Sequence, residues 1–523
     1  MRSPARRVSR QPLAIAVALA LGLGSAHAAS ITVTDGGDAG TAATCTLRQA
    51  IESANTDAAV GNCTAGSGAD TIDFAAGLAG SSITLAGTQL EVDEDLVING
   101  SGQTIDADGN SRVIRVADYT SLTASNLIIT GGNSGSYGGG ISAGYYSSLK
   151  LSNCTVTGNH ADWDGGGIDL DEFASLELTN SIISNNTAND DGGGIYGYAY
   201  NPMTILGSTI SGNQSDDEGG GLYAWEGDVS LSNSTISGNQ AYYGGGLYIR
   251  HGDTSLVGST ISGNQANYEG GGILAGGDAE VAITNSTISD NRTDYYGGGI
   301  FAGTHSDLTI NNSTITGNSA GNGGGIAASA SDYYGTIYQT DILMQNTILT
   351  GNTATGSDPD LGRSGGGEGG PPVRPAKRDQ RATAPGKAGP VGSTIDIHAS
   401  LLGTALQADY TGDGNIFTDA PGLGPLANNG GPTLTHLPQT GSPAINAGNN
   451  GLIPAGISFD HRGAGFPRIV AGTVDIGAVE AAAAPPPAPP PTLVPASSPW
   501  SLGLLGGLLG LLGFLGLRST RGS

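Results

Sequence analysis

A tandem repeat with a period of 25 to 27 residues constrains the fold of this chain more than any other feature. Each copy carries a Gly-Gly-Gly triplet, and an Asn recurs in a second register that keeps step with the triplets. The triplets begin at Gly138, Gly165, Gly192, Gly219, Gly244, Gly270, Gly297 and Gly323, and the Asn residues are Asn159, Asn186, Asn213, Asn239, Asn264, Asn291 and Asn318. Two registers that stay locked over eight copies indicate one structural unit stacked on itself. Such a unit buries its apolar face only against its neighbours.

Short stretches with a period of two dominate each copy and predict β-strands. In one copy, Val229 and Leu231 alternate with Ser, Ile236 continues the pattern after a turn, and Leu247 follows the triplet. Three short strands in about 26 residues predict one coil of a right-handed parallel β-helix, an all-β solenoid whose coils pair at about 4.8 Å. We expect glycine at sharp corners with positive φ. We also expect the recurring Asn amides to form a hydrogen-bonded ladder along the solenoid.

The chain is acidic, and its charge is unevenly distributed. The formal net charge is −26, and between Gly138 and Asn352 the sequence has 22 Asp and Glu residues against three strong bases. A surface of this kind repels nucleic acids and anionic lipids and attracts cations. The composition therefore argues against a nucleic-acid partner and favours Ca²⁺ as a counter-ion. We expect the solenoid to be a monomer.

The N-terminus has the features of a secretory signal peptide. Four arginines within the first ten residues precede an apolar stretch, Leu13–Gly24, and an Ala-x-Ala cleavage site ends at Ala28. We therefore expect export to the cell surface, the outer membrane or the extracellular space. After export, Cys45 and Cys63 are expected to form a disulfide. Cys154 stands where other copies have Ser, which predicts a buried free thiol.

The C-terminal part differs in composition from the repeats. Residues 362–392 carry six Lys and Arg among Gly and Pro, which predicts a basic insertion that is solvated or binds an anionic surface, the acidic solenoid included. A Leu/Gly run from Ser501 to Leu517 follows a proline-rich stretch and precedes two arginines, which predicts a membrane anchor or a sorting tail. The predicted segments are a signal peptide (1–28), an N-terminal cap (29–71), β-helix repeats (72–355), a basic Gly/Pro-rich flexible insertion (356–393), a C-terminal region that closes the solenoid (394–480), a Pro-rich spacer (481–500) and an apolar tail (501–523).

Several stretches resemble known families of secreted bacterial β-helix proteins. Cys45-Thr46-Leu47-Arg48-Gln49-Ala50 resembles the CSLREA motif, with Gln49 in place of the usual Glu. The repeats, which read GGG[IL] and mostly IxxN, are similar to those of chlamydial polymorphic outer-membrane proteins. The region around Trp500 resembles a PEP-CTERM/IPTL-CTERM sorting signal. The C-terminal region, residues 394–480, resembles the choice-of-anchor Q domain through the segments Leu426–Thr433, Gly441–Gly448, Asp460–Gly463 and Asp475–Glu480.

These resemblances imply a secreted, surface-exposed bacterial β-helix protein that is tethered at, or processed through, an envelope membrane. The implied partners are extracellular glycans or cell-surface proteins, a C-terminal sorting machinery and a membrane reached through the tail. Adhesion is the function that the family suggests by analogy, and the resemblance carries over no catalytic residue.

One edge of the solenoid carries the candidate site. The three residues before most of the triplets are rich in acidic and aromatic side chains, and equal register stacks them on successive coils. Carboxylates one coil apart raise one another's pKa or recruit a cation, so Asp164, Asp191 and Glu218 are candidate ligands for Ca²⁺. The neighbouring aromatic side chains offer flat faces on which sugar rings can stack. The candidate ligand-binding residues are Asp162, Trp163, Asp164, Asp190, Asp191, Asp216, Asp217, Glu218, Tyr242, Tyr243, Tyr268, Tyr295 and Tyr296.

Three interpretations of this edge are open: solvated turns that keep an exposed edge soluble, a binding surface for glycans or other cells, and a polysaccharide lyase or hydrolase. Hydrolysis requires a pair of carboxyl groups at a defined separation. A Ca²⁺-dependent lyase also requires a basic residue, and the available bases, Lys150, Arg250 and Arg292, do not recur in the acidic column. The sequence therefore favours a protein of surface recognition or adhesion. A Ca²⁺-dependent polysaccharide lyase or a glycoside hydrolase of the β-helix type is the alternative.

Overall fold

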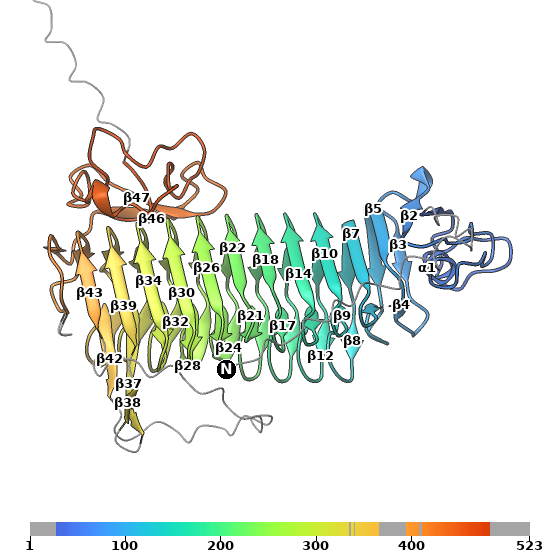
Figure 1. The fold of residues 1–523 in the computed structure, drawn as a ribbon, viewed down its shortest axis with the longest axis horizontal. Helices are drawn as coiled ribbons and strands as arrows, with labels where there is room; N and C mark the ends of the chain where they lie inside the picture. Colours follow the sequence, from blue (N-terminus) through green and yellow to red (C-terminus); the bar gives the residue numbers. More distant parts are fainter. Residues whose placement is uncertain (1–27, 334–335, 339, 366–393, 407–409, 482–523) are drawn as a thin grey trace, which may run out of the picture. The chain divides into compact units, whose positions relative to one another are not determined.

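The computed structural model describes residues 28–333, 336–338, 340–365, 394–406 and 410–481. The predicted signal peptide up to residue 27, most of the basic insertion, and the Pro-rich spacer and apolar tail from residue 482 lie outside the described residues. The described chain forms a right-handed parallel β-helix with about 27 residues per coil, which confirms the predicted fold (Figure 1). No helix in these described ranges is long and apolar enough to span a membrane.

Each coil of the Gly-triplet repeats contains four strands, one more than the sequence predicts. In a representative coil, β13 (Ile168–Leu170) leads into β14 (Ser175–Thr179), and β15 (Ile182–Ser184) and β16 (Thr187–Ala188) follow. Strand β17 (Ile195–Gly197) then starts the next coil. The additional strand is β16, whose two residues are too few to show the apolar alternation by which the other strands are recognised.

The strands of successive coils form three long sheets, which we call sheets A, B and C (Figure 1). Sheet B holds the strand that follows each Gly triplet, together with strands before and after the repeats. Its members are β4 (Leu90–Val92), β6 (Ile114–Val116), β9 (Ile141–Ala143), β13, β17, β21 (Leu222–Trp225), β25 (Leu247–Arg250), β29 (Ile273–Gly276), β33 (Ile300–Ala302), β37 (Ile326–Tyr333), β38 (Thr336–Tyr338) and β42 (Leu361–Gly365). Sheet C holds the short strand after each ladder Asn: β8 (Asn133–Ser134), β12 (His160–Ala161), β16, β20 (Gln214–Ser215), β24 (Gln240–Tyr243), β28 (Gln265–Glu269), β32 (Arg292–Thr293), β36 (Ser319–Ala320) and β41 (Thr353–Ala354).

Sheet A contains the remaining strands of the solenoid, two from each repeat coil. Its members are β1 (Ser30–Val33), β2 (Asp70–Phe74), β3 (Ser82–Thr84), β5 (Leu96–Asp106), β7 (Ser121–Thr130), β10 (Ser148–Ser152), β11 (Thr155–Thr157), β14, β15, β18 (Met203–Leu206), β19 (Thr209–Ser211), β22 (Val229–Ser232), β23 (Thr235–Ser237), β26 (Asp253–Val257), β27 (Thr260–Ser262), β30 (Glu280–Thr284), β31 (Thr287–Ser289), β34 (Asp307–Asn311), β35 (Thr314–Thr316), β39 (Asp341–Gln345), β40 (Ile348–Leu349), β43 (Ile395–His398), β44 (Leu401–Leu402) and β45 (Ile416–Phe417). Pairing is parallel throughout the solenoid except between β37 and β38.

The core is a set of apolar columns inside the coils. In sheet B, Ile168 pairs with Ile195, which pairs with Leu222, and all three side chains are fully buried. Ile236 of sheet A is also fully buried, as its place in the period-two pattern predicts. Each such side chain contributes about 1.5–3 kcal/mol through burial.

The predicted Asn ladder is present and continuous. The Nδ2 of Asn186 donates to the Oδ1 of Asn213 at 3.0 Å, and the same oxygen accepts the backbone N–H of Asn186 at 3.0 Å. Equivalent amide bonds of 2.9–3.0 Å link each ladder residue from Asn159 to Asn352, and Asn352 donates to Asp360. The ladder satisfies buried polar groups that no water reaches, which is the condition for keeping an amide in a dry core.

Each glycine of the triplet is required for its own reason. Gly165, the first of its triplet, has a φ of 67°, in the left-handed region that favours glycine. A Cβ on Gly166 would lie 2.3 Å from the carbonyl oxygen of Thr187, and one on Gly167 would lie 2.5 Å from the carbonyl oxygen of Gly194. The first glycine therefore sets the corner, and the other two allow adjacent coils to approach each other.

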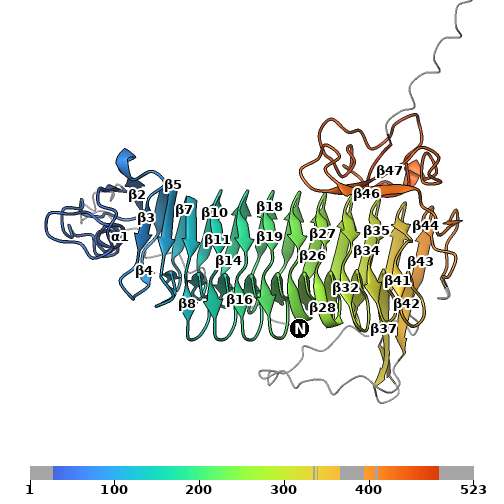
Figure 2. The same cartoon turned by 180° about the vertical axis from the view of Figure 1, so that it is seen from behind.

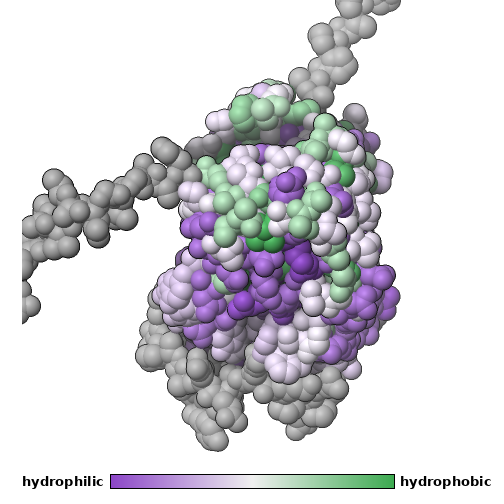
Figure 3. Space-filling view, turned by 90° about the vertical axis from the view of Figure 1, so that its right-hand side faces the viewer, coloured by the Kyte–Doolittle hydropathy of each residue, from purple (hydrophilic) through white to green (hydrophobic). Residues whose placement is uncertain are grey.

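The N-terminal cap contains a helix that the sequence pattern does not reveal. Helix α1 (Leu47–Thr56) begins with a capping box in which Thr46 and Gln49 bond each other's backbone N–H groups. Gln49, the departure from the CSLREA motif, is therefore a competent capping residue. Cys45 and Cys63 form the predicted disulfide, and Cys154 is a buried free thiol as predicted. Figure 3 looks onto this capped end, where hydrophilic residues lie across the centre and hydrophobic residues lie above them.

Residues 394–480, which are predicted to close the solenoid, consist of two parts. Its first strands, β43 and β44, pair with β39 and β40 and continue sheet A. Residues 422–481, which we call the C-terminal lobe, contain β46 (Leu423–Ala427), β47 (Thr435–Pro438) and the 3₁₀ turn η2 (Asn450–Leu452). A second 3₁₀ turn, η1 (Ala76–Leu78), lies between β2 and β3 near the N-terminal end of the solenoid.

The C-terminal lobe lies along the side of sheet A rather than over its end (Figure 2). His461 of the lobe bonds Thr287 at 3.1 Å, and His436 bonds Ser289 at 2.8 Å. The backbone N–H of Ala478 donates to Thr314 at 3.0 Å. These hydroxyls are buried under the lobe. Because buried hydroxyls require hydrogen-bond partners, these bonds hold the lobe against the side of the coils.

Candidate functional site

The residues before the Gly triplets form two columns along one edge of the solenoid, as predicted from their register. The first Gly of each triplet donates its N–H to the carbonyl of the equivalent pre-triplet residue on the next coil, for example Gly165 to Asp191 at 3.0 Å. We call Tyr137, Asp164, Asp191, Glu218, Tyr243, Glu269 and Tyr296 the base column. We call Ser136, Trp163, Asp190, Asp217, Tyr242, Tyr268 and Tyr295 the tip column. Asp162 and Asp216 precede the tip column and are exposed.

The base column packs against outward-facing side chains of sheet B. The second residue after each triplet supplies this row, which runs through paired positions. Its members are Asp169, Tyr196, Tyr223, Tyr248, Leu274 and Phe301. Although they point away from the main core, Asp169 is 7% exposed and Tyr223 is 1% exposed. Glu218 and Tyr223 share a side-chain hydrogen bond. The base column and the sheet B row therefore bury each other and form a second, smaller core outside sheet B.

Burial within this second core changes the titration of its carboxyl groups. Burial raises the pKa of Asp164 to about 7 and that of Asp169 to about 8. It also raises the pKa of Glu218 and of Glu269 to about 7. The pKa of Asp191 is raised well above its usual range by burial and, next in size, by the negative charge of Glu218. Near neutral pH the base column therefore carries less negative charge than its composition indicates.

The tip column is the exposed part of the site. Trp163 is 48% exposed and Tyr295 is 40% exposed. Tyr242 and Tyr268 stack with ring centroids 6.1 Å apart and planes within 5°, and Tyr268 meets Tyr295 at 4.8 Å. Aromatic side chains thus lie on both sides of two carboxylates, Asp190 and Asp217. An exposed surface of this composition can both stack on a ring and bind a polar group beside it.

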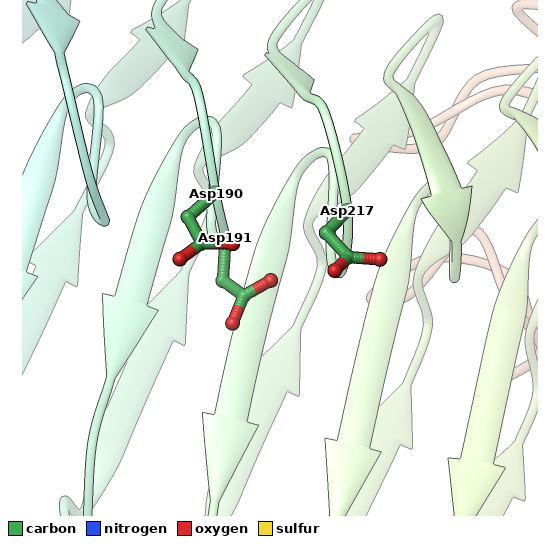
Figure 4. A group of neighbouring side chains, drawn as sticks. All are labelled: Asp190, Asp191 and Asp217. Atoms are coloured by element: carbon green, nitrogen blue, oxygen red, sulfur yellow. The ribbon is translucent and has the colours of Figure 1, made fainter. Parts of the chain in front are cut away.

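One group of carboxylates in the tip and base columns has a geometry suited to a cation. One carboxylate oxygen from each of Asp190, Asp191 and Asp217 lies within 4.8 Å of the others (Figure 4). The predicted trio of Asp164, Asp191 and Glu218 does stack on successive coils, but it is not the set whose oxygens converge. Asp164 is 4% exposed and accepts the backbone N–H of Asp191 at 3.2 Å, so it serves the packing of the loop.

The three bases of the repeats take different positions. Lys150 pairs with Glu177 on sheet A at 3.1 Å, and Arg292 lies 3.4 Å from Asp294. Arg250 lies at the end of β25 with its guanidinium 4.6 Å from the centroid of the Trp225 ring. Its positive charge lowers the pKa of Glu218 and so partly offsets the effect of burial. The structure therefore brings one base to the acidic column, which the sequence register does not indicate.

Sequence reasoning misses the sheet B row and Trp225. Both follow the Gly triplets, whereas all the predicted site residues precede the triplets. The signal is present in the sequence, because Asp169, Tyr196, Tyr223 and Tyr248 each stand two residues after the last Gly of a triplet. An outward-facing Asp or Tyr at a strand position would ordinarily be taken for a solvated residue.

A second stack of rings, three of them exposed, lies at the corner between sheets B and A, away from the triplets. Tyr119 stacks on Tyr146 at 5.6 Å, Tyr146 on Phe173 at 4.6 Å, and Phe173 on Tyr200 at 5.1 Å. All four residues have φ between 54° and 62°. Bulky residues rarely adopt this region. Tyr119 is 70% exposed and provides a comparison for the rings of the tip column.

Comparisons with known proteins identify the fold. A protein-family model described as a right handed beta helix region matches residues 81–229 and 220–358, which together cover more than half of the chain. No curated protein matches the sequence. A solved structure of the pectate lyase Pel9A is similar over 88% of this chain and 98% of its own, at 13% sequence identity and a TM-score of 0.42.

Proposed function

Because this chain belongs to the right-handed β-helix family, we propose that it is a recognition protein that binds glycans along the tip column. The observation that carries this proposal is the placement of aromatic rings on both sides of Asp190 and Asp217, in one column and on consecutive coils, with Trp163 and Tyr295 exposed. The coil spacing of about 4.8 Å is close to the length of one sugar in an extended glycan. Successive sugars can therefore meet successive side chains of the column.

The rings and carboxylates of the tip column supply complementary contacts to a sugar. Trp163 and Tyr295 offer apolar faces to the C–H groups of a sugar ring. Asp190 and Asp217 accept hydrogen bonds from its hydroxyl groups. The net negative charge disfavours polyuronates in the absence of a metal ion, because like charges repel at short range.

We propose Ca²⁺ as a ligand of Asp190, Asp191 and Asp217. These residues supply carboxylate oxygens, which are the donors that Ca²⁺ prefers, and waters or ligand oxygens would complete its coordination. A bound Ca²⁺ would offset two of the three negative charges and would itself offer a ligand position to the carboxylate of an acidic sugar. The predicted ligands Asp164 and Glu218 would then contribute through packing and charge.

We also propose exposure at the cell surface, the outer membrane or the extracellular space. The N-terminal residues 1–28, the composition of the tail and the resemblance to anchored surface proteins support this localisation. Partners are then extracellular glycans or cell-surface proteins, a sorting machinery and, through the tail, a membrane. The function that follows is adhesion or surface recognition.

A second candidate function, cleavage of a polysaccharide, has one specific observation in its favour. Asp164 and Glu218 have pKa values of about 7, so either carboxyl group could donate a proton to a glycosidic oxygen near neutral pH. Arg250 beside Glu218 also provides a cation for the acid group of a uronate. Against this candidate, the carboxyl groups concerned are covered by their own neighbours, whereas a catalytic group must reach its substrate.

Equilibrium binding to a panel of plant, algal and bacterial polysaccharides tests the recognition proposal. We expect saturable binding of at least one polymer, weakened at least tenfold by Trp163→Ala and by Tyr295→Ala. Tyr119→Ala removes a more exposed ring from the other corner and should leave the affinity unchanged. Equal loss in all three variants, or no binding by the wild type, would refute binding at the tip column.

A further inference from the structure

A groove on the outward face of sheet A is separate from the candidate site. It has a volume of about 610 Å³ and lies where β18, β22, β26, β30 and β34 begin. Acidic residues form one side, and small residues form the floor. The acids are Asp228, Asp253, Glu280 and Asp307, and the floor is Thr204, Ser230, Ser255, Ala282 and Thr309.

The sequence creates this groove by a change of side-chain size within one row of sheet A. The floor position is occupied by Lys150 and Glu177 in two earlier coils, where their paired side chains cover the sheet. From Thr204 onward the same position holds small residues. Beyond Thr309 the row continues with Leu343, a larger side chain. The groove therefore has two ends as well as a floor.

The acidic side of the groove is a regular column. Asp253 pairs with Glu280, Glu280 with Asp307, and Asp307 with Asp341, while the N–H of Asp253 donates to Asp228 at 3.2 Å. Five carboxylates thus extend over four coil spacings, or about 19 Å. Like charges at this spacing repel one another, so a cationic chain laid along the column would stabilise it.

The end of this column is also where a basic segment of the same chain rejoins the solenoid. Residues 366–393, which lie outside the described residues, contain five Lys and Arg and two acidic residues. The next residue, Thr394, donates its N–H and its hydroxyl to the Oδ1 of Asp341, at 2.9 and 3.0 Å. The basic segment is therefore tethered at the last carboxylate of the column.

The length of the segment fits the column. The segment has 28 residues, and a random coil of this length has a root-mean-square end-to-end distance of about 30 Å, which exceeds the length of the groove. Four of its bases lie between Arg374 and Arg381, and seven extended residues of a Pro-containing chain span about 22 Å, against about 19 Å for the carboxylates. The tether also raises the effective concentration of the segment at the groove, to the millimolar range for a short linker.

We propose that residues 366–393 dock in this groove, with their Lys and Arg side chains paired to the carboxylates of Asp253, Glu280 and Asp307. The occupant is a part of this chain, so the acidic face of sheet A is covered intramolecularly. The tip column, which belongs to a different edge of the solenoid, stays accessible to an external ligand. The docking is electrostatic and weakens as salt screens the charges.

Zero-length carbodiimide coupling of the full chain tests this proposal, because the reagent joins Lys amines to carboxylates in contact. The sequence has only three lysines: Lys150, Lys377 and Lys387. The Lys150–Glu177 pair, 3.1 Å apart, is the internal positive control. Peptide mass spectrometry should find Lys377 or Lys387 joined to Asp253, Glu280 or Asp307, and at least fivefold less of these products in 1 M NaCl.

Two triple variants, each of which replaces three carboxylates by neutral amides, make the test specific. Asp253→Asn, Glu280→Gln and Asp307→Asn together should abolish the links to the groove while the Lys150–Glu177 link persists. The matched control, Asp162→Asn, Asp216→Asn and Asp294→Asn, removes three carboxylates beside the tip column and should leave the links intact. The proposal is overturned if Lys150 couples normally but Lys377 and Lys387 do not, or if they couple to Asp190 and Asp217. Links formed only between two copies of the chain would overturn it as well.

Discussion

The backbone N–H of Glu218 donates a hydrogen bond to the Oδ1 of Asp191 on the preceding coil, at 2.9 Å. The same arrangement joins Asp191 to Asp164 at 3.2 Å. These acids therefore hold the loops of consecutive coils together. Their role in packing explains why they are buried, and their burial explains their raised pKa values.

This arrangement predicts that stability falls as the pH rises from about 4 to about 7. Unfolded carboxyl groups titrate near pH 4, whereas burial raises the pKa of Asp164 and Glu218 to about 7 in the folded state. The folded state binds more protons in this interval, so their stabilising contribution is complete below about pH 4 and lost as the pH passes about 7. The melting temperature of the wild type should therefore be higher at pH 5 than at pH 8.

Two variants isolate the effect of the base column from that of other groups. Asp164→Asn should reduce the slope of melting temperature against pH, while Asp162→Asn, an exposed neighbour, should leave it unchanged. Buried His461 has a pKa lowered to about 3 and contributes stability that rises with pH between about 3 and 6.5, so differences between variants are the informative quantity. Identical slopes in all three proteins would contradict the account of the base column.

Removing one rung of the Asn ladder should destabilise the fold strongly. Asn239→Ala leaves the buried backbone N–H of Asn213 without a partner. It also removes one hydrogen bond each from the Nδ2 of Asn213, the Oδ1 of Asn264 and the carbonyl oxygen of Ile210. We expect a loss of about 2–4 kcal/mol in the free energy of unfolding, because each unpaired buried polar group costs about 1–3 kcal/mol. Denaturant unfolding measures it. Asn267→Ala, at an exposed position of strand β28, should change it by less than about 0.5 kcal/mol.

A charge placed in the main core should disrupt local stacking. Ile236 is fully buried, so Ile236→Asp introduces an unpaired carboxylate into a dry apolar column. We expect a large fall in melting temperature and loss of amide-exchange protection in the adjacent coils. Ser230→Asp, on the outward face of the same sheet, is the control and should have a small effect. Unchanged unfolding of the Ile236 variant would mean that this side chain faces outward.

The cysteines should differ in their importance for stability. Reduction of the disulfide between Cys45 and Cys63, which are 18 residues apart in the sequence, removes a constraint on the unfolded chain. It should lower the free energy of unfolding by about 2–4 kcal/mol. Cys154→Ser should be tolerated, because Ser181 and Ser208 occupy the equivalent positions and bond along the coils. Thermal melts with and without reductant, on the wild type and the Cys154→Ser variant, measure both effects. A Cys154→Ser protein that melts as low as the reduced wild type would contradict this assignment.

The periodic part of the structure could be predicted from the sequence because each coil repeats the same short strands, Gly triplet and ladder Asn. The register of the triplets places the base and tip columns, and the polar character and spacing of the recurring Asn indicate the ladder. Stacking in register is a consequence of parallel pairing, so Asp164, Asp191 and Glu218 fall on successive coils without further information.

The remaining features depend on where individual side chains point and on what covers them, and the repeat period does not determine either. The local backbone of each loop decides which carboxylates point toward one another. For this reason the oxygens that lie close together belong to Asp190, Asp191 and Asp217 and not to the predicted set. Tyr223 is buried outside sheet B only because Glu218 and its neighbours cover it. The C-terminal lobe has no repeat, so its placement on the hydroxyls of Thr287 and Ser289 could not be predicted from periodicity.

The most direct test of recognition as the function is to incubate the wild-type protein with the polysaccharide panel, with and without Ca²⁺. Bound polymer and newly formed chain ends, both reducing and unsaturated, are followed in the same samples. The account predicts saturable binding of at least one polymer and no increase in chain ends over time. Sustained release of chain ends by the wild type, lost in Asp191→Asn, would show that the protein is an enzyme and would contradict the account.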